Sequence, residues 1–166
     1  MAAETWLDDI QQETWRSYLT MVRELERHLR QHLQHECGMS VPEYELLARL
    51  SEAPGQRLPV ATLVESTGWE PSRLSHQLTR TGKRGLISRV PSPHTRYPDV
   101  VLTEEGFTLI ARAAPRHVEA VQSLFLEPLG QEGRSALDAI TRKILSGLDA
   151  HQADNCSLRT DAPQEE

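Results

Sequence analysis

The chain has 166 residues, a formal net charge of −6 at pH 7, and 38% apolar but only 5% aromatic residues. This length predicts one domain with its own core. The absence of an apolar run of about 18 residues excludes a membrane-spanning helix, and the polar, acidic start does not resemble a signal peptide. Only Cys37 and Cys156 occur, so we expect no structural disulfide and a cytoplasmic location.

The first predicted helix is long and carries an apolar stripe. Residues 5–35 contain no Gly or Pro, and apolar residues recur at steps of three and four. These are Trp15, Leu19, Val22, Leu25, Leu29 and Leu33. A small domain cannot cover such a helix alone, so we expect part of the stripe to pack on a second subunit. Gly38 ends this helix, and Ser40 with Glu43 predicts a capping box for the next one.

Three further helices are predicted before the middle of the chain. Residues 41–52 form an apolar helical pattern, and residues 60–67 form a shorter one that Gly68 terminates. Trp69 is expected to hold the turn that follows, and residues 71–86 form the next helix. A short helix, a Gly turn and a second helix together predict a helix-turn-helix.

The segment 71–98 differs from the rest of the chain in charge. It contains six basic residues and no acidic residue, so the remainder carries a formal charge of −12. Such a contrast localises an anionic partner. After the basic helix, residues 86–90 and 97–102 predict two strands joined by the loop PSPHTR, which is a candidate wing.

The C-terminal part is predicted to be helical. Thr103 is a suitable N-cap for a helix that Pro128 and Gly130 interrupt. A last amphipathic helix then carries Leu137, Ile140, Ile144 and Leu148 on one face. Residues 151–166 have neither apolar periodicity nor bulk, so we expect a disordered tail.

Four sequence segments carry a resemblance to a known family. They are VPEYELLARLSEAPGQRL (41–58), WEPSRLSH (69–76), RGLISR (84–89) and VVLTEEG (100–106). In this order and spacing, the chain from about Trp6 to Leu148 resembles the MarR family of bacterial transcriptional regulators, especially a subgroup common in actinobacteria. The resemblance implies an obligate homodimer that binds palindromic double-stranded DNA operators, often as a repressor. It also implies release by a small anionic or phenolic effector, or by oxidation.

The expected fold class is mainly α with a small β-wing. A single winged helix-turn-helix and dimerisation domain covers residues 1–150, with its DNA-binding part at about 40–103. The resemblance assigns dimerisation to helices from both ends of the domain, at about 5–35 and 104–150.

Ten residues are candidate DNA contacts. They are Ser72, Arg73, Ser75, His76, Gln77, Arg80, Arg84, His94, Thr95 and Arg96. Arg73 suits a bidentate pair with guanine and Gln77 one with adenine, whereas Arg80 and Arg84 suit phosphates. Arg96, at the hairpin tip, suits a narrow minor groove.

The chain departs from the family pattern at two places. His94 stands where members commonly carry an Asp that braces the wing arginine, here Arg96. Glu70 precedes the basic helix where the family often has a small or basic residue, and its charge repels phosphate unless it points away.

Other functions have less support. A protein-interaction module of the same fold, with reduced DNA binding, is the alternative that these two departures favour. The histidines His28, His32 and His35 share a helix face near Cys37, which leaves a zinc site or a thiol sensor open. No nucleophile elbow, P-loop or paired-carboxylate motif occurs, so we expect neither an enzyme nor a cofactor.

Overall fold

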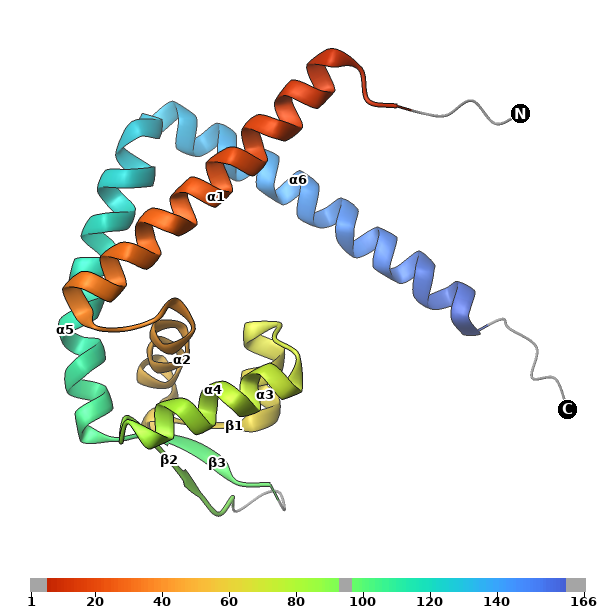
Figure 1. The fold of residues 1–166 in the computed structure, drawn as a ribbon. Helices are drawn as coiled ribbons and strands as arrows, with labels where there is room; N and C mark the ends of the chain where they lie inside the picture. The colour runs from red at the N-terminus through yellow and green to blue at the C-terminus, as the bar shows by residue number, and fades with distance from the viewer. Residues whose placement is uncertain (1–5, 93–96, 161–166) are drawn as a thin grey trace, which may run out of the picture. The chain divides into compact units, whose positions relative to one another are not determined.

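The second helix has the predicted bounds, whereas the first begins at Asp9, later than the start of the predicted range of about 5–35. The computed structural model describes residues 6–92 and 97–160 (Figure 1). Helix α1 (Asp9–Cys37) starts after Asp8, whose carboxylate accepts the Gln11 N–H, and it ends at the left-handed Gly38. Helix α2 (Val41–Glu52) starts after Ser40, whose hydroxyl accepts the Glu43 N–H at 3.3 Å.

The predicted helix-turn-helix and hairpin are confirmed. A 3-10 turn, η1 (Pro54–Gln56), leads into strand β1 (Arg57–Pro59), helix α3 (Val60–Thr67) and helix α4 (Pro71–Lys83). Strands β2 (Ile87–Val90) and β3 (Asp99–Leu102) then form an antiparallel sheet with β1, in the order β1-β3-β2. Leu58 and Arg89 both lie opposite Val100 in this register, so β3 is the central strand.

The sheet leads directly into the C-terminal helices. Thr103 accepts the Gly106 N–H at 3.0 Å and caps helix α5 (Glu104–Val121), as predicted. Gly106 lies so close to the Leu86 carbonyl that a Cβ atom there would approach the oxygen to 2.0 Å. Only glycine therefore allows this contact between α5 and the start of the hairpin. A π-helical segment, η2 (Gln122–Leu126), and helix α6 (Glu127–Thr160) follow.

The chain divides into two compact units, residues 1–122 and 123–166, where the sequence predicts one domain over residues 1–150. In the first unit, α1 and α2 both pack against α5, and α2 also contacts α4 and β3. Its core is mainly leucine, with Leu46, Leu47, Leu50, Leu63 and Leu74 fully buried. These contacts hold α3, α4 and the sheet around α2.

The second unit differs from the sequence prediction at its end. Gly130 has a non-helical conformation, which confirms the predicted interruption. Helix α6 then continues to Thr160, so residues 151–160 are helical where the sequence predicts disorder. A helix that has already formed can continue past its apolar stripe, because each further residue adds one backbone hydrogen bond, and apolar periodicity therefore does not mark its end. Across the described ranges, no helix combines the length and apolar character needed to cross a bilayer.

Candidate nucleic-acid interface

The turn between α3 and α4 is built by Gly68 and Trp69. Gly68 has φ 65°, a left-handed conformation that ends α3, and its N–H donates to the Val64 carbonyl at 3.0 Å. Trp69 is 8% exposed, and its N–H donates to the Thr67 hydroxyl at 3.2 Å. The indole therefore joins the core at the turn, which confirms the predicted role of Trp69.

Burial along α4 identifies the side of the helix that faces solvent. Leu74, Gln77, Leu78 and Thr81 point into the protein. Because an α-helix turns by about 100° per residue, the opposite side is centred near Ser72, Thr79 and Lys83. We define the outer face of α4 as its exposed polar residues around that centre: Ser72, Ser75, His76, Thr79, Arg80 and Lys83. The DNA contacts predicted from the sequence include four of these six residues but not Thr79 or Lys83.

The prediction that Gln77 reads a base is corrected by its burial. Gln77 lies three residues after Leu74 and four before Thr81, so it shares their inward side of the helix. It is 7% exposed, and its side-chain amide donates to the Thr81 hydroxyl at 3.0 Å. An adenine contact would require this amide to leave the protein interior.

Arg84 binds the protein itself rather than standing free at the end of α4. Its Nη1 donates to the carboxylate of Glu43 and to the Gly38 carbonyl, the latter at 3.3 Å. Glu43 is 3% exposed. Burial raises the pKa of this carboxyl above its usual range, and the Arg84 guanidinium acts in the opposite direction. Arg84 thereby connects the end of α4 with the end of α1 and the start of α2.

Glu43 also takes part in the predicted capping at the start of α2. The Ser40 hydroxyl accepts the Glu43 N–H, which is half of a capping box. The Glu43 carboxylate reaches back toward the backbone N–H of Ser40, a contact that lowers its pKa, and it also pairs with Arg84.

Arg73 lies on the same side of α4 as Gln77 and Arg84, beside the outer face. Its guanidinium carbon is 5.0 Å from the centre of the Trp69 ring, which is a cation–π distance. The side chain is exposed and also lines a pocket on the α2 side of α4. We name Arg73, Gln77 and Arg84 the inner flank of α4, since the side chain of each contacts the protein itself.

The base of the hairpin is held by an ion pair that the sequence does not reveal. Arg57 on β1 donates through Nε to Asp99 Oδ2 at 2.7 Å and through Nη2 to the Pro91 carbonyl at 2.8 Å. Asp99 begins the central strand and is 4% exposed. Arg57 thus ties β1 to β3 and to the residue after β2. The predicted wing contacts His94, Thr95 and Arg96 lie outside the described residues.

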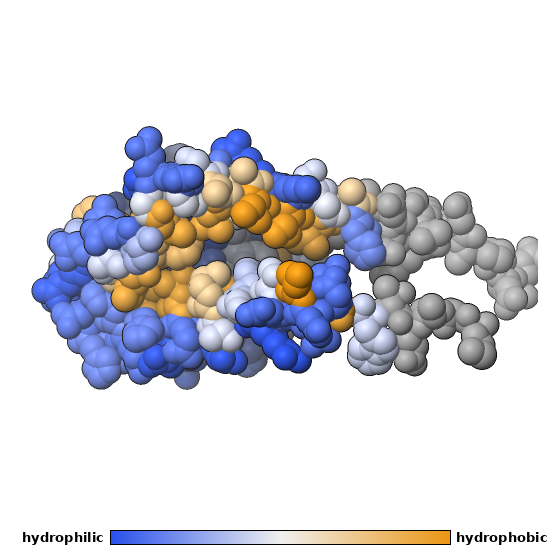
Figure 2. All heavy atoms as spheres, turned by 90° about the horizontal axis from the view of Figure 1, so that it is seen from above, coloured by the Kyte–Doolittle hydropathy of each residue, from blue (hydrophilic) through white to orange (hydrophobic). Residues whose placement is uncertain are grey.

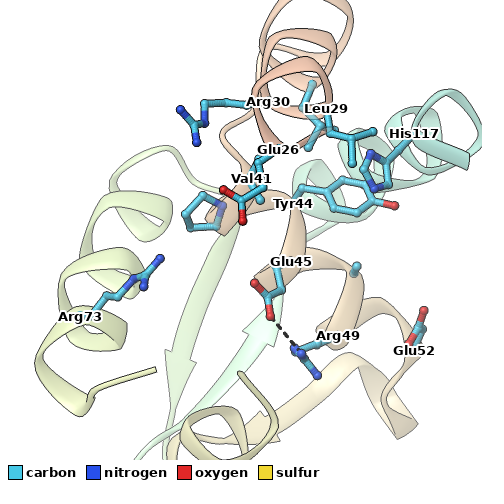
Figure 3. A pocket seen from close by; sticks show the side chains of 13 residues that line it. Glu26, Leu29, Arg30, Val41, Tyr44, Glu45, Arg49, Glu52, Arg73 and His117 are labelled. Carbon is cyan, nitrogen blue, oxygen red and sulfur yellow. Dashed lines mark hydrogen bonds and ion pairs between the residues drawn. The ribbon is translucent and has the colours of Figure 1, made fainter. Parts of the chain in front are cut away.

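A pocket of about 640 Å³ opens between α1, α2, α4 and α5 (Figure 3). Its apolar part includes Leu29, Val41 and Tyr44, whose ring lies 4.4 Å from the ring of His117 between centroids. The Nδ1 atom of His117 is buried without a hydrogen-bond partner. Burial lowers the pKa of His117, and nearby His32 lowers it further. Arg73 points from α4 toward this pocket (Figure 3), so the inner flank and the pocket share a residue.

The histidines of α1 do not gather into a ligand set in the part of the chain that is described. No group of three His, Cys, Asp or Glu side chains there could hold a metal ion. His28 contacts Arg27 on the same helix, and His32 contacts the Arg116 carbonyl at 3.0 Å. Cys37 is a buried free thiol, 6% exposed.

Comparison with known proteins agrees with the helix-turn-helix geometry. No family profile matches the chain. The regulator PecS of Dickeya dadantii (strain 3937), an HTH-type transcriptional regulator, is 30% identical over 120 residues, which cover 70% of this chain and 69% of PecS. The chain belongs to the MarR family of transcriptional regulators.

Two solved structures from Streptomyces coelicolor support this membership. The MarR-family regulator Sco3205, solved in complex with DNA, is 36% identical with a TM-score of 0.82, over 87% of this chain and 91% of that one. The MarR-family regulator AbsC is 35% identical with the same TM-score, over 88% and 99% of the two chains. The predicted family and the winged-helix fold are therefore confirmed.

Proposed function

We propose that this MarR-family chain is a sequence-specific regulator that binds double-stranded DNA by inserting α4 into the major groove. The observation that carries this proposal is the outer face of α4, whose polar side chains point to solvent. An α-helix with its side chains is about 10–12 Å across, which fits a groove about 12 Å wide, and the 13 residues of α4 extend about 20 Å along it. Support also comes from Sco3205, which was solved with DNA bound.

The outer face combines the two kinds of contact that specific binding needs. Arg80 and Lys83 are cations without a described ion-pair partner, and they suit phosphates. Ser72 and Ser75 are short and suit phosphates or base edges, and His76 lies between them and Arg80. Arg73 reaches DNA from the inner flank when it leaves Trp69, and the hairpin loop with His94, Thr95 and Arg96 supplies the minor-groove contact.

The proposed DNA-binding form is a homodimer on a palindromic operator. Just before α1, Trp6 is 78% exposed, and on α1 Ile10 is 78% and Trp15 52% exposed, more apolar surface than a monomer usually leaves open. Figure 2 shows apolar residues gathered at the surface rather than scattered singly. Within the second unit, Ile140, Ile144 and Leu148 form a similar exposed row. A two-fold dimer would bury such faces and match a two-fold symmetric operator.

We further propose that the protein is a repressor in the cytoplasm and that a small molecule in the pocket between α1, α2, α4 and α5 releases it from DNA. The volume of about 640 Å³ falls in the range of ligand sites. An anionic ligand there would draw Arg73 toward the pocket and away from the DNA, because one guanidinium cannot serve both partners.

The alternative is a protein-interaction module that has lost DNA binding. It is favoured by the inner flank, where Gln77 and Arg84, two of the predicted contacts, bind the protein itself.

A binding titration decides between the two. The full chain is incubated with a randomised duplex library, and the enriched duplexes are titrated by fluorescence anisotropy, while sedimentation measures the mass of the free protein. We expect enrichment of a palindromic motif and a dimeric mass. A library that remains unenriched at low salt would reject the DNA-binding proposal and favour the interaction module.

A further inference from the structure

Thr79 occupies the middle of the outer face of α4. It lies between Ser75 and Lys83 at four-residue steps, and it is exposed. The N-terminal residues of a recognition helix meet the base edges first, and Thr79 follows Ser72 and Ser75 on the same outer face as α4 lies along the groove. Thr79 is therefore placed to meet a base.

The hydroxyl of Thr79 already has a partner. Its Oγ1 donates to the Ser75 carbonyl at 2.9 Å, one turn earlier in the helix. This bond fixes the χ1 rotamer of the threonine and uses its single donor. The oxygen can still accept a hydrogen bond, but the group that distinguishes Thr79 from the serines of the outer face is its Cγ2 methyl.

No other outer-face residue carries a methyl group. The remaining members, which the structure describes in full, are two serines, a histidine, an arginine and a lysine. In the major groove, the C5-methyl of thymine is the apolar group among the base edges, and the Thr methyl is one of its usual partners.

We propose that Thr79 is a specificity-determining residue, whose methyl group packs against the C5-methyl of a thymine in the DNA half-site. This inference rests on the proposed entry of α4 into the major groove. It assigns an apolar contact to a helix that otherwise presents polar and cationic groups. Burying one methyl group corresponds to about fourfold in affinity at each half-site.

The test removes the methyl group from either side of the contact. Each thymine of an enriched duplex is replaced singly by deoxyuridine, which lacks only the C5-methyl, and affinity is measured by anisotropy. The protein variants are Thr79→Ser, which keeps the hydroxyl and removes the methyl, and Thr79→Val, which keeps a methyl. We expect both to fold as the wild type does, because the side chain is exposed, and thermal unfolding checks this.

We expect one thymine position per half-site at which deoxyuridine weakens wild-type binding about fourfold. Because the variant dimer lacks the methyl at both half-sites, Thr79→Ser should bind the unmodified duplex about sixteenfold more weakly and no longer respond to deoxyuridine, whereas Thr79→Val should retain the response. The inference is overturned if no position responds, if Thr79→Ser responds as the wild type does, or if Thr79→Val no longer responds. If the wild type binds no duplex at all, the proposed function falls as well.

Discussion

The outer face and the inner flank of α4 both carry basic and polar side chains, but they differ in what these side chains contact. His76, Arg80 and Lys83 point to solvent, whereas Arg84 pairs with buried Glu43 and Gln77 bonds to Thr81. Of two arginines four residues apart, Arg84 forms an ion pair with Glu43, whereas Arg80 acts on the same carboxylate only through its charge. A basic residue on a recognition helix is not automatically a DNA contact, because the protein also uses such residues to hold the helix in place.

The largest expected effect comes from removing Arg84. Arg84→Ala leaves the Glu43 carboxylate buried without its cation, and we expect the free energy of unfolding to fall by about 2 kcal/mol, less than for a fully buried pair because Arg84 is half-exposed. Denaturant unfolding measures this decrease. Lys83→Ala is the matched control on the adjacent outer face, and it should change stability by less than about 0.5 kcal/mol. If Arg84→Ala and Lys83→Ala were equally stable, the claim that the inner flank stabilises the protein and the outer face does not would be wrong.

A smaller effect is expected at Gln77. Gln77→Ala leaves the Thr81 hydroxyl buried without its partner, which should cost about 1–2 kcal/mol of stability without changing the preferred DNA sequence. His76→Ala, next to it on the outer face, should change the sequence preference and leave stability unaltered. Unfolding curves and library selection measure the two properties side by side. If Gln77→Ala selected a different DNA motif, Gln77 would contact a base after all.

The smallest effect is a pH dependence at the inner flank. The folded-state pKa of Glu43 is raised by burial above the usual value of 4.5. The folded protein therefore binds a proton more readily than the unfolded chain, and this contribution to stability is present below pH 4.5 and is lost as the pH rises through the folded-state pKa. One proton accounts for at most about 1.4 kcal/mol per pH unit.

Unfolding free energies measured across this pH window should show the decrease in the wild type. Glu43→Gln should remove it, because the amide does not titrate in this range. Arg84→Ala should increase it, because the guanidinium opposes the shift. If the unfolding free energies of the wild type and Glu43→Gln changed with pH in parallel, Glu43 would not be the group that causes the decrease.

The order of elements could be predicted from local signals, because each boundary depends on nearby residues. Gly68 ends α3 and Thr103 caps α5 through hydrogen bonds within four residues along the chain. The bond between Arg84 and Glu43 joins residues that are 41 positions apart, and the one between Arg57 and Asp99 spans 42. No local pattern marks such pairs, since they form only when the chain has folded.

Which side of α4 faces solvent was predicted less well than which residues form the helix. The side of α4 predicted to contact DNA was only partly right, because Arg73, Gln77 and Arg84 lie roughly a third of a turn from the centre of the outer face, whereas Ser72, Ser75, His76 and Arg80 lie on it. The error comes from treating polarity as exposure, because Gln77 and Thr81 are polar yet satisfy each other inside the protein. The positions opposite Leu74 and Leu78 would have identified Thr79 and Lys83. The end of α6 was missed for another reason, since its last turns carry no apolar stripe.

The central claim, that the outer face rather than the inner flank holds DNA, is tested most directly by the salt dependence of binding. Anisotropy titrations of one enriched duplex at several salt concentrations would compare Arg80→Ala and Lys83→Ala with Arg84→Ala. Each outer-face variant should bind more weakly and lower the slope of log affinity against log salt by about one for every phosphate that it no longer neutralises. Arg84→Ala, measured where it remains folded, should keep the wild-type slope. A reduced slope for Arg84→Ala together with unchanged slopes for Arg80→Ala and Lys83→Ala would contradict the account.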